Sequence, residues 1–356
     1  MLVGALSFIF VLGVVIFIHE LGHFLVAKWV GIRVEKFSLG FPPTIFSWKR
    51  GETEYCVGII PLGGYVKMAG ENPDEEATGA EDEFMSKTVG QRAAVIFAGP
   101  FMNYVLAILV LISIFLIAGR PLFDQDRIVV GEVTKGDPAW EAGLRPDDVI
   151  LAIDGVAMTD YDSLRLSIYD YLSEPLELTW LSGVDTLTAA ITPMTEVLPN
   201  ESGGVDTIGR IGFAQKVMAR EKYGFGESVS KGFVTTHVIV WETAKFLKKL
   251  VLHQVSMRMV GGPIFIAQQS AREAQKGAES LFFFIALLSV NLAVLNVLPI
   301  PILDGGHLLF LLIEKLRGSP LSIKTRMMAQ QVGLVLLLLL IVAVTYNDIL
   351  RVFRGF

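Results

Sequence analysis

The sequence predicts an α-helical membrane protein with about four spanning helices and an α+β region inserted between the second and the third. Composition gives the first indication: apolar residues make up 52% of the 356 residues, charged residues only 19%, and the mean hydropathy is +0.54. These values are too apolar for an ordinary soluble domain. The second indication is that the apolar residues gather in long runs. The formal net charge is −6 and the sequence contains no basic tract, so no nucleic-acid partner is expected.

The apolar runs cover residues 2–26, 93–118, 281–303 and 331–346. The third run is interrupted by prolines and the fourth is short. Basic residues concentrate in the connection after the first run and in the short connection before the fourth. Because positive residues favour the cytoplasmic side, both connections are placed in the cytoplasm, and the termini and the long middle region outside.

The first run ends in a His-Glu-x-x-His sequence, His19 to His23. Two histidines four residues apart project from one helix face and can bind one metal ion, with Glu20 placed to take a proton from water on that metal. Burying such groups in a spanning helix is costly, so they favour intramembrane chemistry. One alternative is a polar cluster at the membrane surface. Another is a secretory signal, which the absence of preceding basic residues and of a small-residue cleavage site disfavours.

A metal site of this kind needs a third protein ligand. Asp304 is the candidate, because residues 296–307 carry the other acid inside an apolar stretch, at a similar expected depth. Prolines and glycines around it should break the helix, and irregular backbone at membrane depth survives only where it is buried or lines a wet cavity. His307 is the competing ligand. Cys56 is the only cysteine, which excludes a thiolate cluster.

Together these motifs resemble the site-2 protease family of intramembrane zinc metalloproteases, and most closely the bacterial regulator of sigma-E protease group. The resemblance implies that Zn²⁺ is the cofactor, held by His19, His23 and Asp304, and that Glu20 is the catalytic acid and base. It also implies that Asn296 contacts the substrate backbone. Asn291, earlier on the same span, is either a second substrate contact or a helix-packing residue.

A β-hairpin is expected between the first two spans. Residues 44–48 and 53–59 read as strands around a turn at 49–52, and residues 61–68 follow. The resembling family has a comparable membrane-associated β-element, whose free edge could pair with an unwound substrate. The alternative is an ordinary cytoplasmic hairpin.

The inserted region reads as a strand at 128–133, two Asp- and Gly-rich segments at 136–144 and 147–155, and a helix at 161–171. This pattern resembles a single PDZ domain of the bacterial protease type. Such a domain either binds a peptide C-terminus or filters substrates by size. The filter is slightly favoured, because the sequence does not identify a carboxylate pocket.

Residues 225–252 combine an apolar helical stripe with lysines, which predicts an amphipathic helix on the outer membrane face that contributes to a substrate gate. The alternative is packing against the PDZ domain. The acidic residues 71–83 are expected to form a solvated loop. The expected division is 1–118 for the first two spans and the hairpin, 119–198 for the PDZ domain, 199–280 for a linker and the amphipathic helix, and 281–356 for the last two spans.

The expected function, taken from the resemblance, is zinc-dependent cleavage inside the bilayer of single-span membrane proteins already shortened by another protease. Anti-sigma factors and signal-peptide remnants are the expected substrates in such regulated intramembrane proteolysis. The expected location is the bacterial inner membrane, with the PDZ domain extracytoplasmic. One alternative is a non-catalytic scaffold presenting the PDZ domain, which would lack a zinc-site residue. Another is a metal transporter, which would need several polar spans.

Overall fold

The computed structural model describes residues 2–71, 79–199 and 205–354. The chain forms two compact units. The first comprises residues 1–114, 225–247 and 257–355, and the second comprises residues 115–224 and 248–256. Most of the expected acidic loop, residues 72–78, lies outside the described residues.

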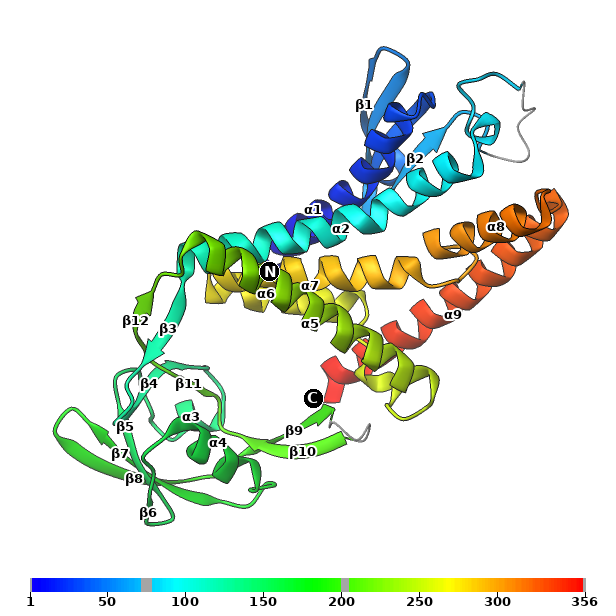
Figure 1. Ribbon diagram of the computed structural model, residues 1–356. Coiled ribbons are helices and arrows are strands. Elements are labelled where there is room, and N and C mark those ends of the chain that lie inside the picture. The colour runs from blue at the N-terminus through cyan, green and yellow to red at the C-terminus, as the bar shows by residue number, and fades with distance from the viewer. Residues whose placement is uncertain (1, 72–78, 200–204, 355–356) are drawn as a thin grey trace. The chain divides into compact units, whose positions relative to one another are not determined.

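Four helices of the described chain are long and apolar enough to cross a membrane. They are α1 (Leu2–Trp29), α2 (Val89–Ala118), α7 (Ala278–Val297) and α9 (Ile323–Arg354) (Figure 1). A helix that could span a membrane is therefore present at each of the four expected positions. The third ends before Pro299, since proline and the residue before it do not continue a helix. The fourth is longer than its apolar run, because the polar residues before that run are good helix formers.

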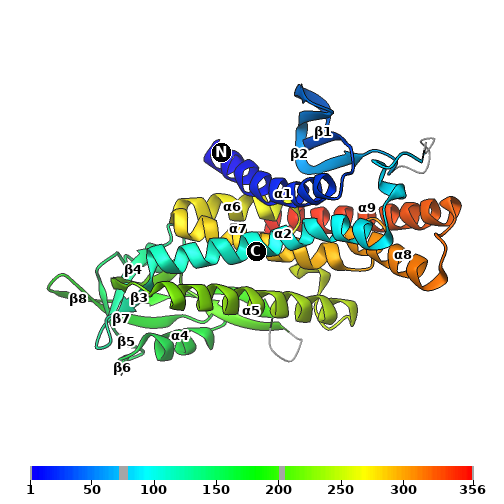
Figure 2. The ribbon, with the colours of Figure 1, turned by 45° about the horizontal axis from the view of Figure 1, so that its top comes forward.

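Three further helices complete the first unit. They are α5 (Phe225–Val251), which confirms the expected helix there, α6 (Pro263–Lys276) and α8 (Asp304–Arg317). Helix α6 packs against α1 and α7 (Figure 2). Its first turn is capped from α9, because the backbone N–H groups of Gly262 and Phe265 donate to the buried carboxylate of Asp348.

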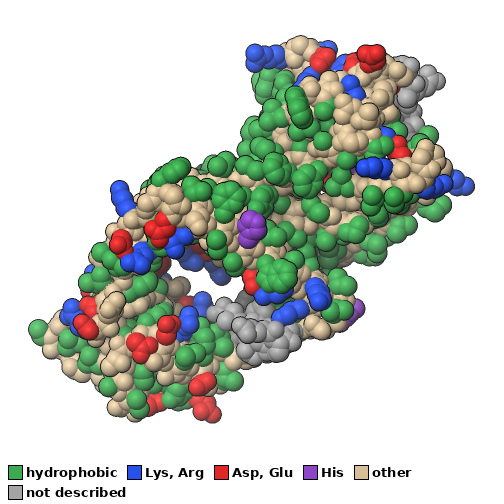
Figure 3. All heavy atoms as spheres, in the orientation of Figure 1, with side chains coloured by type: hydrophobic (Ala, Val, Ile, Leu, Met, Phe, Trp, Pro, Cys, Tyr) green, Lys and Arg blue, Asp and Glu red, His purple; other side chains and the backbone are tan. Residues whose placement is uncertain are grey.

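In the first unit one buried apolar cluster lies where α1 meets α7, around Val11, Val15, Phe284 and Ile285. A second packs the hairpin strands against α1 and α2, around Phe37, Ala27 and Val95. Many other apolar side chains of these helices stay exposed, above all along α9. Hydrophobic side chains accordingly cover much of the face drawn in Figure 3. Exposed apolar surface of this extent is what a lipid-facing helix presents.

The expected hairpin is present and longer than the sequence indicated. It consists of β1 (Val34–Arg50) and β2 (Thr53–Met68), paired antiparallel. The turn holds Gly51 with φ of +63°, a conformation that glycine adopts without strain. The tip of the hairpin exposes apolar side chains, among them Ile45 and Phe46.

Each hairpin strand pairs twice, because both bend. Residues 34–39 of β1 lie between residues 64–68 on one side and residues 54–57 on the other. Residues 44–50 of β1 pair with residues 53–58 of β2, on the other side of that segment. Residues 64–68 therefore form an edge of this small sheet and have no second strand partner in the described chain.

The second unit is built on an antiparallel sheet in the order β11-β4-β5-β7-β8, with β6 paired to β5. Its core buries Trp180, Leu144, Ile150 and Leu164. The sheet includes β11, so it draws on chain beyond residue 198. The elements of this unit are β3 (Arg120–Phe123), β4 (Ile128–Val133), α3 (Pro138–Glu141), β5 (Val149–Ile153), β6 (Val156–Ala157), α4 (Tyr161–Tyr169), β7 (Leu176–Ser182), β8 (Asp185–Ile191), β9 (Met194–Pro199), β10 (Val205–Arg210), β11 (Phe213–Gln215) and β12 (Val217–Glu221).

Candidate metal centre

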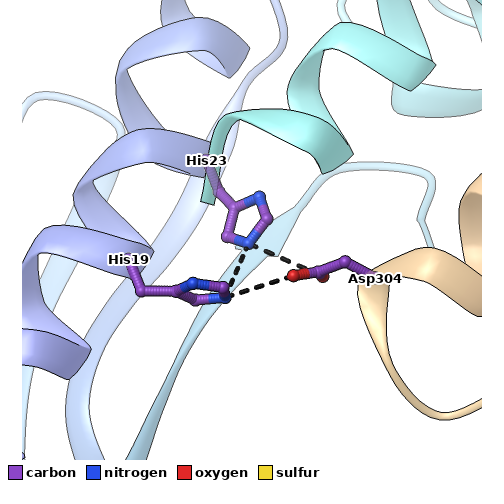
Figure 4. A group of neighbouring side chains, drawn as sticks. All are labelled: His19, His23 and Asp304. Atoms are coloured by element: carbon purple, nitrogen blue, oxygen red, sulfur yellow. Dashed lines mark hydrogen bonds and ion pairs between the residues drawn. The ribbon is translucent and has the colours of Figure 1, made fainter. Parts of the chain in front are cut away.

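Two histidines of α1 and one carboxylate at the start of α8 point at one another (Figure 4). His19 Nε2 lies 3.2 Å from Asp304 Oδ2 and 3.2 Å from His23 Nε2. His23 Nε2 lies 3.7 Å from Asp304 Oδ1. The four-residue spacing places both rings on one face of α1, and the break between α7 and α8 brings the first residue of α8 opposite them.

The three donors fit a zinc ion. Tetrahedral zinc with nitrogen and oxygen ligands at ~2.0–2.1 Å would hold those atoms roughly 3.3–3.4 Å apart, close to the distances found here. The Oδ2 atom of Asp304 is buried and accepts no hydrogen bond from the described residues. Facing nitrogen lone pairs and an unpartnered carboxylate oxygen repel one another, and a cation between them removes that repulsion.

Helix α2 orients the ring of His23. The Nδ1–H of His23 donates to the backbone carbonyl of Val95 at 2.9 Å, which leaves Nε2 free to bind a metal. Gly99, one turn further along α2, faces the same ring. A Cβ at Gly99 would lie 2.3 Å from His23 Nε2, so only glycine lets α2 approach the histidines this closely.

Two amides border the ring of His19. Asn296, at the end of α7, places its Nδ2 3.3 Å from His19 Nε2. The predicted substrate-binding residue is therefore next to the proposed metal position. Asn103 of α2 places its Nδ2 3.3 Å from His19 Nδ1, on the other side of the ring.

Glu20 lines a cavity of about 410 Å³ together with His19, His23 and Asp304. Edge residues 64–66 and 68 of β2 line the same cavity. The fit at this wall is tight, since a Cβ at Gly64 would lie 2.9 Å from Glu20 Cγ. The proposed acid and base and the edge of the hairpin thus face one common space.

The other predicted residues lie as follows. Asn291 accepts a hydrogen bond from the Thr243 hydroxyl at 2.7 Å, which joins α7 to α5 and corresponds to the helix-packing alternative. His307 lines the cavity, but the donor group that converges within 4.8 Å, among the described residues, is His19, His23 and Asp304.

A buried ion cluster borders this cavity away from the histidines. Arg92 of α2 donates to Glu314 of α8 through both guanidinium ends, at 2.5 and 3.2 Å. Arg326 of α9 reaches the same carboxylate at 3.4 Å. Arg92 and Glu314 are both buried, so the cluster ties three helices together beside the cavity.

The model of peptidase family M50 matches residues 7–340. The chain belongs to this family. The zinc metalloprotease RasP of Geobacillus kaustophilus is 33% identical to it over an alignment of 424 positions, gaps included, which covers 98% of each chain. The regulator of sigma-W protease RasP of Bacillus subtilis is 31% identical over an alignment of 426 positions, which again covers 98% of each chain. A protein of Rhizobium meliloti is 36% identical over an alignment of 369 positions, which covers 96% of this chain and 95% of that protein.

The family resemblance drawn from the two motifs is thereby confirmed, and with it the expectation of a zinc-dependent peptidase. Helices that can span a membrane and relatives of the RasP type make the chain a membrane protein. The PDZ assignment, the domain limits and the roles of individual residues remain predictions.

Sequence reasoning missed two residues of α2 that contact the histidines, Gly99 and Asn103. A signal for both was present. Asn103 is an amide within an apolar run, and Gly99 precedes Pro100 in that run, where neither residue type favours a helix.

Proposed function

We propose that this M50 metalloprotease hydrolyses a peptide bond within the membrane-spanning segment of single-span membrane proteins that another protease has already shortened. Anti-sigma factors and signal-peptide remnants are the proposed substrates, in regulated intramembrane proteolysis. The observation that carries the proposal is the convergence of His19, His23 and Asp304, from two helices distant in sequence, on a point that fits zinc.

In the proposed reaction His19, His23 and Asp304 hold the metal. Bound zinc supplies a Lewis acid that polarises a carbonyl group and makes water more acidic. Glu20, on the wall of the same cavity, takes the proton of the attacking water and delivers it to the leaving amine. Asn296, whose amide lies beside His19, binds the substrate backbone near the cleaved bond. The scaffold alternative predicts a missing site residue, whereas all of these are present.

A helical substrate hides its carbonyls in its own hydrogen bonds, so it must unwind before hydrolysis. Residues 64–68 of β2 are suited to hold the unwound chain, because they form a sheet edge and all of them but Lys67 line the cavity that contains Glu20. An extended peptide that adds to this edge would hydrogen-bond its backbone groups to the strand and lie in the cavity that Glu20 also lines.

The proposed location is the bacterial inner membrane, with the second unit outside the cytoplasm. Basic residues lie in the connection between α1 and α2 and at the adjoining ends of α8 and α9, where Lys315, Arg317, Lys324 and Arg326 flank the turn, and this supports placing both regions in the cytoplasm. In the first unit α5 presents exposed Phe233, Val238 and Trp241, which suits a helix lying on the outer membrane face as part of a substrate gate.

The second unit is proposed to be a single PDZ domain. A groove of about 190 Å³ lies between α4 and residues 209–213, lined by Leu164, Ile168 and Phe213 among others. A groove between a helix and an extended segment supports the role of binding a peptide. The alternative role, filtering substrates by size, does not require a groove. Cleavage of substrates with and without a bulky outer domain separates the two roles, because a filter rejects the bulky substrate whatever its C-terminus.

The proposed reaction is tested by cleavage in liposomes of a single-span substrate that lacks its outer domain. Glu20→Gln keeps the size of the side chain but cannot act as a base, so we expect cleavage to fall about 100-fold or more while zinc content stays at the wild-type level. A zinc chelator should stop the wild type. Unchanged cleavage by Glu20→Gln would remove Glu20 from the reaction.

A further inference from the structure

Asn103 is fully buried on α2, in contact with a proposed metal ligand but out of reach of the metal position. Its side chain lies 3.3 Å from His19 Nδ1, the ring nitrogen that faces away from His23 and Asp304. The Oδ1 atom of Asn103 is itself buried and has no hydrogen-bond partner in the described part of the chain. A buried amide with an idle acceptor is costly, so its place calls for an explanation.

The explanation follows from the ring of His19. Because Nε2 faces the other two donors with its lone pair, the proton of the neutral ring is on Nδ1. A protonated Nδ1 needs an acceptor, and an amide nitrogen is none. The oxygen and nitrogen of an asparagine side chain are told apart only by their partners. Turning the Asn103 amide by half a turn brings Oδ1 to Nδ1 and gives up no hydrogen bond that Oδ1 now makes.

We propose that Asn103 is a positioning residue for the metal centre: its Oδ1 accepts the Nδ1–H of His19, which fixes the tautomer and the direction of that ring. This inference rests on the proposed role of His19 as a ligand. Metal-binding histidines in general donate their second ring N–H to a protein acceptor, and loss of such an acceptor weakens metal binding by 10–100-fold.

The rest of α2 supports this reading. Val95, Gly99 and Asn103 recur every four residues and so follow one side of the helix. The carbonyl of Val95 accepts from His23, Gly99 lies against the ring of His23, and Asn103 reaches His19. One face of α2 thus contacts the Nδ1 atom of both histidines: a backbone carbonyl accepts from His23, and the side chain of Asn103 lies against His19.

Asn103 is also held firmly. The hydroxyl of Ser289, on α7, donates to the backbone carbonyl of Asn103 at 2.8 Å, and both residues are fully buried. This bond joins α2 to α7 without touching His19. Ser289→Ala is therefore a matched control: it loosens the helix contact but leaves the amide of Asn103 in place.

The test measures zinc affinity by chelator competition on the full chain in detergent. We expect Asn103→Leu, which has a similar size and no acceptor, to bind zinc about 10–100-fold more weakly, and Asn103→Asp, which keeps an acceptor, to bind it at least as tightly as the wild type. Ser289→Ala should stay within about threefold of the wild type, since no contact to His19 is lost. Equal affinity in Asn103→Leu and the wild type would overturn the inference.

A second readout separates positioning from packing and from charge. The chain has five histidines, so ¹⁵N-labelled histidine allows each ring to be assigned by substitution. In the zinc-loaded wild type we expect a hydrogen-bonded Nδ1–H signal for His19 that Asn103→Leu loses and Asn103→Asp keeps. Its absence in the wild type would refute the inference even if Asn103→Leu failed to fold.

A further variant distinguishes this inference from the proposed function. His19→Ala should lose most zinc affinity. If it binds zinc normally, the proposed ligand set fails and the inference fails with it. If His19→Ala loses zinc but Asn103→Leu does not, the ligand set stands and the role of Asn103 alone is refuted.

Discussion

Replacing Gly99 with alanine places a methyl group against the two histidines. The new Cβ would lie 2.3 Å from His23 Nε2 and 2.8 Å from His19 Cε1, whereas ordinary contacts begin near 3.4 Å. The deficit at His23 is about 1 Å. Both rings are buried, so either α2 moves away or the rings turn from the metal position.

Such a displacement exceeds the ~0.2 Å tolerance of metal–ligand distances, and a misplacement of about 1 Å at an active site costs on the order of 100-fold in rate. We therefore expect Gly99→Ala to reduce cleavage about 100-fold and to lower zinc content at limiting zinc. Alanine is the better helix former by about 1 kcal/mol, so helix propensity does not account for a loss.

The matched control is Gly90→Ala on the same helix, because a Cβ at Gly90 meets no atom within 4 Å. It should keep wild-type cleavage and zinc content. The assay is the rate of cleavage in liposomes, with zinc measured by mass spectrometry on the same samples. If Gly99→Ala cleaves within about threefold of the wild type and holds full zinc, the close approach of α2 to the histidines is refuted.

Two further predictions concern the ion cluster and the second unit. Glu314→Leu leaves Arg92 and Arg326 without their shared carboxylate and should destabilise the protein by about 3–5 kcal/mol. Arg92→Leu should destabilise the protein less, because Arg326 still pairs with Glu314. Equal shifts in melting temperature for the two variants would contradict this prediction. In the second unit the Tyr171 hydroxyl donates to Asp154, which lowers the pKa of that carboxyl below its usual 3.8. The pair therefore contributes stability above pH 3.8, and this stability is lost as the pH falls through the lowered pKa. Tyr171→Phe should therefore speed amide exchange in β7 at neutral pH and make that exchange rate depend less on acid pH. Identical exchange profiles in the variant and the wild type would refute the coupling between Tyr171 and Asp154.

The sequence was sufficient for the spans and the motif pair because their signals are local. An apolar run reports its own helix, and the spacing of His19 and His23 reports a shared face. The pairing with Asp304 was within reach because an acid in an apolar stretch has few physical explanations.

The rest depends on how helices meet. Nothing local to Gly99 or Asn103 says that this face of α2 lies against the histidines; the glycine matters only because a ring is 2.3 Å from its missing Cβ. The double pairing of β1 and β2 likewise depends on where both strands bend, and that bend makes residues 64–68 an edge beside the cavity. Register and helix contacts are tertiary choices that periodicity does not encode.

The most direct test of the central claim is zinc K-edge absorption of the purified full chain. We expect zinc bound by two imidazole nitrogens and by oxygen at ~2.0–2.1 Å, without sulfur. Asp304→Ala should change the spectrum and lower the zinc content. A sulfur ligand, or a spectrum that Asp304→Ala leaves unaltered, would contradict the claim that His19, His23 and Asp304 hold the metal.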